Sequence, residues 1–264
     1  MTESIAILHH MARSGGTLIS KCLGSMEDIA LLSEVHPFAT SGQFNPLDQA
    51  NNWLGIDVLG ELAALGKGNE VTWLDAIEII HRCVSTQGRK LVVRDWSHLD
   101  FTGVPWVQPT YQTTTAQLLG TKFDIHQAYS VRHPIDQWLS LSKLGVIAGK
   151  LDVATYLKGY RAFAEVAVDD GFLRYEDFTA APELGIQQLC EAMRLDYDPG
   201  FLSRWSSFTS ITGDVSTEGG GRATGSDDIT PLTRRRPEPE LLAEFERSPD
   251  FQPSLALLGY EVLC

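Results

Sequence analysis

The stretch IAILHHMARSGGTLISKCL, residues 5–23, decides the fold class. Its apolar run at residues 5–8 is short and contains two β-branched side chains, which is typical of a buried strand. Gly15 and Gly16 end this part of the chain, and the apolar residues that follow lie on one helical stripe. The chain therefore opens with a strand, a glycine-containing turn and a helix.

Strand and helix patterns continue to alternate beyond this unit. Short apolar runs predict further strands at residues 29–32, 90–95, 124–131 and 171–175. Periodic apolar patterns predict helices at residues 17–23, 47–65, 71–84, 134–146, 152–168, 182–194 and 238–247. This alternation predicts an α/β fold, a parallel β-sheet with helices on both faces, in a single domain over residues 1–264.

The composition indicates a globular protein and argues against a nucleic-acid partner. The chain has 264 residues, of which 43% are hydrophobic, enough for one sizeable core. It carries 21 Lys and Arg against 34 Asp and Glu, a net charge of −13. Such a field repels polyanions, so we expect no nucleic-acid partner. A small anionic ligand remains compatible with this charge if a few cationic side chains gather locally.

The four cysteines (Cys22, Cys83, Cys190 and Cys264) show neither metal-ligand spacing nor a disulfide framework. The N-terminal apolar run precedes its basic residue, the reverse of a secretory signal. No window approaches the length of apolar chain that spans a membrane. We therefore expect a cytoplasmic protein with no membrane span and no bound metal.

The turn at residues 13–17 has the chemistry of a phosphate site. The N–H groups of a first helical turn point at an anion, and the helix dipole adds to the attraction. Gly15 and Gly16 allow close approach of the backbone, Ser14 and Thr17 offer hydroxyls, and Arg13 offers a bidentate cation. The Walker A string G-x-x-x-x-G-K-S/T is absent, which argues against ATPases and GTPases of that type.

A second anion-binding candidate runs from residue 129 to residue 140. Arg132 lies at the carboxyl end of a predicted strand, and Pro134 suits the first turn of the helix that follows. Ser140 lies two helical turns further on. The spacing predicts an arginine and a hydroxyl that close on one phosphate.

Together these strings resemble the P-loop sulfotransferase family, whose members transfer sulfuryl groups from 3′-phosphoadenosine 5′-phosphosulfate (PAPS). Residues 13–17 are similar to the 5′-phosphosulfate loop P-R/K-S-G-T-T, although the chain has Ala12 and Gly16 where the family has Pro and Thr. Two further sets of residues match the family's later strings in order, and Pro182 follows the second. The sets are Arg132, Pro134, Asp136 and Ser140 for R-x-P-x-D-x-x-x-S, and Tyr175-Glu176-Asp177 for a late Tyr-Glu-Asp.

The resemblance implies a PAPS-dependent sulfotransferase that needs no metal and sulfates a hydroxyl of an unidentified small-molecule, sugar or lipid acceptor. It implies that Arg13 acts at the bridging oxygen, and that the rest of the co-substrate is held by Ser14, Gly15, Gly16, Thr17, Arg132, Ser140, Tyr175 and Arg222. Arg222 belongs to a polar stretch at residues 206–239, which we expect to be a mobile loop over the nucleotide and which also carries Arg234–Arg236. We expect the helical insert at residues 42–87, with residues 99–110, to lie over the acceptor.

The catalytic base remains open between two residues. The strand at residues 90–95 delivers Arg94, Asp95 and His98 to a carboxyl end, where sites of parallel sheets form. Arg94 matches a family Lys at this place. His98 is favoured over Asp95 because imidazole titrates near working pH. His9 and His10 at the end of the first strand either face the acceptor or serve the structure.

Two alternative functions share this fold. One is a nucleotide-binding module that has lost transfer, which Gly16 motivates. The other is an atypical P-loop small-molecule kinase, in which Asp95 would assist a Mg²⁺ ion. We expect Trp53, Trp73 and Trp106 to belong to the core.

Overall fold

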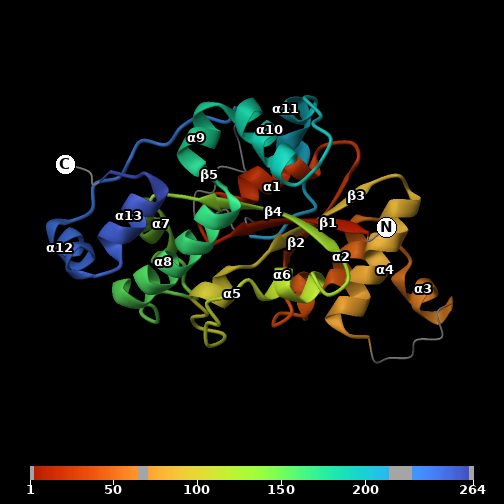
Figure 1. The fold of residues 1–264 in the computed structure, drawn as a ribbon, viewed down its shortest axis with the longest axis horizontal. Helices are drawn as coiled ribbons and strands as arrows, with labels where there is room; N and C mark the ends of the chain where they lie inside the picture. Colours follow the sequence, from red (N-terminus) through yellow and green to blue (C-terminus); the bar gives the residue numbers. More distant parts are fainter. Residues whose placement is uncertain (1–2, 65–70, 214–227, 262–264) are drawn as a thin grey trace.

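The computed structural model describes residues 3–64, 71–213 and 228–261, and its centre is a five-stranded parallel sheet in the order β2-β3-β1-β4-β5 (Figure 1). The strands are β1 (Ser4–His10), β2 (Ile29–Val35), β3 (Lys90–Asp95), β4 (Asp124–Val131) and β5 (Phe172–Arg174). Each pairs in parallel with its neighbour. The predicted α/β fold with a parallel sheet is therefore confirmed.

Alternating side chains of β1 divide the core into two layers. Ala6 and Leu8 pack on one face, whereas Ile5 and Ile7 pack on the other. The first face is covered by α1 (Gly16–Gly24), α9 (Tyr175–Ala180), α10 (Pro182–Ala192) and α11 (Phe201–Arg204), which is followed by the 3-10 turn η2 (Trp205–Ser207). Both faces of the sheet are thus buried, as parallel sheets require.

The second face is covered by two groups of helices. Beside β2 and β3 lie α2 (Pro46–Trp53), α3 (Val58–Ala64), α4 (Trp73–Thr86) and α6 (Thr114–Leu119). Beside β4 lie α7 (Pro134–Leu141), α8 (Val153–Asp170), α12 (Pro239–Arg247) and α13 (Phe251–Leu258). Two short elements, η1 (Gly42–Phe44) and α5 (His98–Phe101), complete the set. Among the described residues, no helix is long and apolar enough to cross a membrane.

The region predicted as one helix over residues 47–65 forms two helices, α2 and α3. Gly55 lies between them with φ of +67°, a left-handed conformation that interrupts a right-handed helix. Ala50 of α2 and Val58 of α3 pack in the core on this face of the sheet, together with Ile77 and Ile80 of α4. These helices therefore cover one face of the sheet.

The order of the strands positions the site. β1 is central, with β3 on one side and β4 on the other, so the chain leaves three adjacent strands at the same edge. Ligand crevices of open α/β sheets form at this carboxyl edge. The segments after β1, β3 and β4 carry most of the residues that the sequence nominated.

Candidate active site

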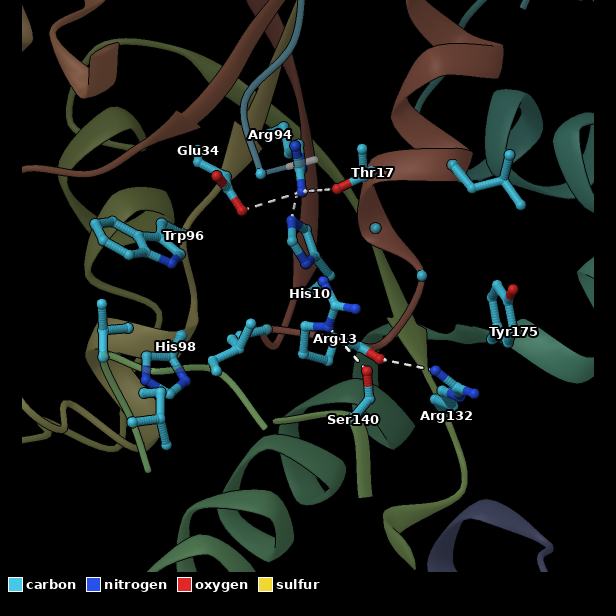
Figure 2. A pocket seen from close by; sticks show the side chains of 18 of the residues that line it. His10, Arg13, Thr17, Glu34, Arg94, Trp96, His98, Arg132, Ser140 and Tyr175 are labelled. Carbon is cyan, nitrogen blue, oxygen red and sulfur yellow. Dashed lines mark hydrogen bonds and ion pairs between the residues drawn. The ribbon is translucent and has the colours of Figure 1, made fainter. Parts of the chain in front are cut away.

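A cavity of about 490 Å³ opens at the carboxyl edge of the sheet. Figure 2 shows Trp96 and His98 on one side of it and Arg132 and Tyr175 on the other, with Arg13 and His10 between them. The first side carries aromatic groups and an imidazole, and the second carries cations.

The N-terminus of α1 faces the cavity without a side-chain cap. Gly15, the residue before the helix, has φ of +93°, a conformation that favours glycine. A Cβ built on Gly15 would lie 2.1 Å from the Tyr175 ring, so this ring packs directly on the turn. The uncapped N–H groups of the first turn of α1 are available to an anion.

Arg13 and Arg132 are held in place beside this turn. Nε of Arg13 donates to Oγ of Ser140 at 2.9 Å, and Nη1 of Arg132 donates to the Arg13 carbonyl at 3.2 Å. The Arg132 guanidinium also lies over the Tyr175 ring, 5.0 Å from its centroid. Arg13, Arg132, Ser140 and Tyr175 thus come from separate elements to one end of the cavity.

Arg235 adds a third cation to this end. Asp136, in the first turn of α7, accepts from the Arg235 backbone N–H at 3.0 Å and pairs with the Arg234 guanidinium. These bonds fix the segment so that the Arg235 side chain lines the cavity. Three arginines therefore gather here in a chain whose net charge is −13.

Arg94 lies under the loop and is 1% exposed. It donates through Nε to His10 Nε2 at 2.7 Å, through Nη2 to Thr17 Oγ1 and Glu34 Oε1, and through Nη1 to Ser33 and Thr212. These bonds commit all five N–H groups of the guanidinium to the protein. Arg94 therefore positions Thr17, His10 and Glu34 at the base of the cavity, which it also lines.

This cluster has a fixed charge state. Burial and the Arg94 charge lower the pKa of His10 to about 4, so its imidazole is neutral. Although burial opposes ionisation of Glu34, the Arg94 charge and a hydrogen bond from the Thr212 hydroxyl bring the pKa of its carboxyl below the usual value. Glu34 also has φ of 52°, a left-handed conformation rare for a side chain of this kind.

His98 lines the opposite side of the cavity and is 1% exposed. Its Nε2 donates to the Val104 carbonyl at 2.9 Å, which leaves Nδ1 as the nitrogen with the lone pair. Nδ1 has no hydrogen-bond partner among the described residues. Because burial lowers the pKa of His98, the ring is a neutral imidazole with an unused acceptor atom.

Asp95 does not line the cavity. Its side chain is fully buried and accepts from Ser97 and Thr115 hydroxyls at 2.5 Å and from His9 Nδ1 at 3.0 Å. Burial opposes its ionisation, but these bonds and the two histidines nearby hold its pKa well below the usual range. Asp95 is therefore a structural carboxylate that ties the end of β3 to α6.

The structure thus separates the sequence candidates by position. The residues that line the cavity are Arg13, Gly15, Gly16, Thr17, Arg94, His98, Arg132, Ser140 and Tyr175. Ser14 lies below the loop, where its hydroxyl donates to the Met11 carbonyl at 2.8 Å. Arg222 lies outside the described residues. No group of three or more potential metal ligands occurs in the described parts of the chain.

Several cavity residues had no signal in the sequence. Glu34 lies sixty positions before its partner Arg94, so no local motif joins them. Phe44 and Trp96 stack at 4.4 Å on the side that holds His98. The expectation that Trp106 belongs to the core is wrong, because Trp106 is 47% exposed and lines the same side.

Comparison with solved structures identifies the class of fold. A sulfotransferase domain from the curacin biosynthetic pathway superposes with a TM-score of 0.63 at 16% identity, covering 99% of both chains. A sulfotransferase domain from the olefin synthase of Synechococcus PCC 7002 gives 0.62 at 15% identity, over 100% of this chain and 98% of the other. No family model and no curated protein matches the chain. The protein therefore has the sulfotransferase fold, as its motifs predict.

Proposed function

We propose that the protein is a sulfotransferase that moves the sulfuryl group of PAPS to a hydroxyl of an acceptor. The observation that carries this proposal is the polarity of one cavity. At one end, Arg13, Arg132 and Arg235 surround the uncapped N-terminus of α1. At the other end, His98 lines the cavity, and its buried Nδ1 has no hydrogen-bond partner among the described residues.

The cationic end fits the charges of PAPS, which carries a 5′-phosphosulfate and a 3′-phosphate. The first-turn N–H groups of α1, Thr17 and Arg13 would bind the phosphosulfate. Arg132, Ser140 and Arg235 would bind the 3′-phosphate, and Tyr175 would lie beside the adenine. Arg222, a candidate from the sequence alone, would be a further ligand of the nucleotide.

The reaction is a single in-line displacement. The acceptor oxygen forms a bond to sulfur while the bond from sulfur to the bridging phosphate oxygen breaks, and its electron pair stays with the 5′-phosphate. The hydroxyl proton passes to His98, and 3′-phosphoadenosine 5′-phosphate (PAP) is the leaving product. The terminal nitrogens of Arg13 carry no hydrogen bond to a described residue, so they can neutralise charge on the leaving phosphate.

Two geometric arguments support His98 over Asp95 as the base. His98 lines the cavity with a lone pair unused, whereas Asp95 is sealed from it and fully hydrogen-bonded. A sealed Asp95 also weighs against the kinase alternative, which relied on that carboxylate. In this proposal Arg94 is a positioning residue, because its donors hold Thr17, His10 and Glu34.

The test of the base is a comparison of transfer and binding in His98→Ala. We expect kcat to fall by about 10²- to 10⁴-fold, the usual contribution of a general base. The affinity for PAP should stay within about twofold, because His98 lies away from the arginines. Unchanged kcat would remove His98 from the mechanism. A wild-type protein that binds PAP but sulfates no hydroxyl would be the nucleotide-binding module instead.

A further inference from the structure

An aromatic wall forms the side of the cavity that holds His98. Phe44 and Trp96 stack with ring centroids 4.4 Å apart and planes 17° from parallel. Trp106 is tilted against Trp96 at 5.1 Å and meets the His98 ring edge-on at 5.7 Å. All four side chains line the same cavity. A flat ring is the shape that such a wall binds best, since offset and edge-on contacts between rings are favourable.

The lining of the cavity also includes aliphatic side chains. Leu144, Val146 and Ile147, from the segment after α7, line the cavity as well. Val146 is 50% exposed and Trp106 is 47% exposed, so apolar surface is left uncovered at the rim. Exposed apolar surface at a cavity mouth marks the place where an apolar ligand is held.

Among the described residues, no titratable group on this side offers an unpaired charge to an acceptor. Glu34 and Arg94 are paired with each other at 3.1 Å. His98 is neutral because burial lowers its pKa. An acceptor with a carboxylate or an ammonium next to the wall would bury that charge without a partner, which is costly.

The wall is held rigid by buried polar side chains behind it. Gln49, 2% exposed, donates to the carbonyl of Gln43, the neighbour of Phe44, at 2.7 Å and also bonds the backbone of Ser33. The loop after α5, which carries Trp106, is fixed by Asp100, which accepts from Thr110 and Thr114. A wall fixed before the ligand arrives loses little entropy on binding.

From these features we infer the class of acceptor: an uncharged molecule that carries its hydroxyl on a flat apolar ring system, such as a phenol or naphthol. The ring lies against Phe44, Trp96 and Trp106, and its hydroxyl donates to Nδ1 of His98. This inference rests on the proposed function, because it concerns the acceptor of the same transfer. Trp106 is the residue of the wall that sets this specificity at the mouth.

The test is calorimetric titration with four hydroxyl compounds, both with and without saturating PAP. The probes are 2-naphthol, the straight-chain 1-octanol, N-acetylglucosamine and the cationic phenol tyramine. We expect 2-naphthol to bind at least about tenfold more tightly than each of the others. Tighter binding of the sugar, the linear alcohol or the amine would overturn the inference.

Variants of Trp106 give the second arm. Trp106→Ala should weaken 2-naphthol binding about tenfold, and Trp106→Phe should restore most of it because a ring remains. Phe38→Ala is the matched control, since Phe38 is an aromatic residue with 48% exposure that does not line the cavity. Equal naphthol affinity in wild type and Trp106→Ala would contradict the inference.

The same titrations separate this inference from the proposed function. PAP affinity should be unchanged in every one of these variants, because the wall lies away from the arginines. Failure of the wild-type protein to bind PAP overturns the proposed function, whatever 2-naphthol does. Binding of PAP without a preference for 2-naphthol overturns the acceptor class alone.

Discussion

The imidazole of His10 occupies the space that a side chain at residue 16 would need. A Cβ built on Gly16 would lie 2.3 Å from Nδ1 of His10. The His10 ring is 1% exposed and accepts from Arg94 at 2.7 Å, so it has no room to move. The departure from the family loop, Gly where Thr is usual, therefore has a packing cause.

Gly16→Thr should consequently lower the free energy of unfolding by about 1–3 kcal/mol, the usual range for overpacking. Urea denaturation measures this loss. Gly145→Ala is the control, because a Cβ there meets nothing within 4 Å, and it should change stability by less than about 0.5 kcal/mol. In a His10→Ala background the cost of Gly16→Thr should shrink. A Gly16→Thr protein as stable as wild type would refute the packing argument.

The hydrogen bonds of Asp136 to the Arg234–Arg235 segment should contribute to nucleotide affinity, because they hold the Arg235 side chain at the cavity. Asp136→Asn removes the charge that fixes this segment, so we expect PAP affinity to fall about tenfold, and Arg235→Ala should lose at least as much. Arg236→Ala is the control: this neighbour is exposed and does not line the cavity. Equal losses in Arg235→Ala and Arg236→Ala would show that only the general charge of the segment matters.

Two buried histidines predict an acid-sensitive fold. Burial, with the Arg94 charge, lowers the pKa of His10 to about 4, and burial, with the Arg234 charge, lowers that of His133 to about 4. As pH falls below about 6.5, the unfolded chain takes up protons that the folded chain refuses. Stability should therefore decline between about pH 6.5 and 4, by on the order of 3 kcal/mol for each histidine.

Urea denaturation at about pH 7, 6 and 5 measures this decline. His133→Asn is the matched variant, because His133 caps α7 by accepting from the Ile135 N–H and Asn can keep that bond without titrating. The variant should show roughly half the pH dependence of the wild type. A flat profile in the wild type would contradict the burial argument.

The pH dependence of transfer reports on His98. As a base it must be unprotonated, and burial places its pKa below the ordinary 6.5. We expect kcat/KM to be level at neutral pH and to fall only in acid, with a midpoint below 6.5. The residual activity of His98→Gln should lack this acid limb. If kcat/KM of His98→Gln fell in acid as it does in the wild type, the titrating group would be a residue other than His98.

Much of this architecture follows from local sequence patterns. Each predicted strand is present, because a short apolar run bounded by turns is typical of a buried strand. Gly15 and Gly16 likewise predict the turn before α1. The break at Gly55 was not predicted, because a left-handed glycine inside a periodic pattern changes the backbone without changing the pattern. Short helices such as α5 and α11 carry too few residues for a period to show.

The site was predictable only where a motif joins neighbouring positions. Arg132 and Ser140 belong to one string, and both reach the cavity. Glu34 and Trp106 become cavity residues through the order of the strands and the course of a loop, neither of which composition or spacing encodes. The proposal of His98 over Asp95 likewise rests on the structure, because hydrogen bonds and burial distinguish the fully bonded Asp95 from His98, whose Nδ1 has no partner among the described residues.

The most direct test of the proposed function is calorimetric titration of the protein with PAP, with AMP and with ATP plus Mg²⁺. We expect micromolar binding of PAP and at least about tenfold weaker binding of AMP, since AMP lacks the 3′-phosphate for Arg132, Ser140 and Arg235. Arg132→Ala should remove most of that difference. A preference for ATP would indicate a kinase, and equal affinity for PAP and AMP would contradict the 3′-phosphate site and the sulfotransferase assignment with it.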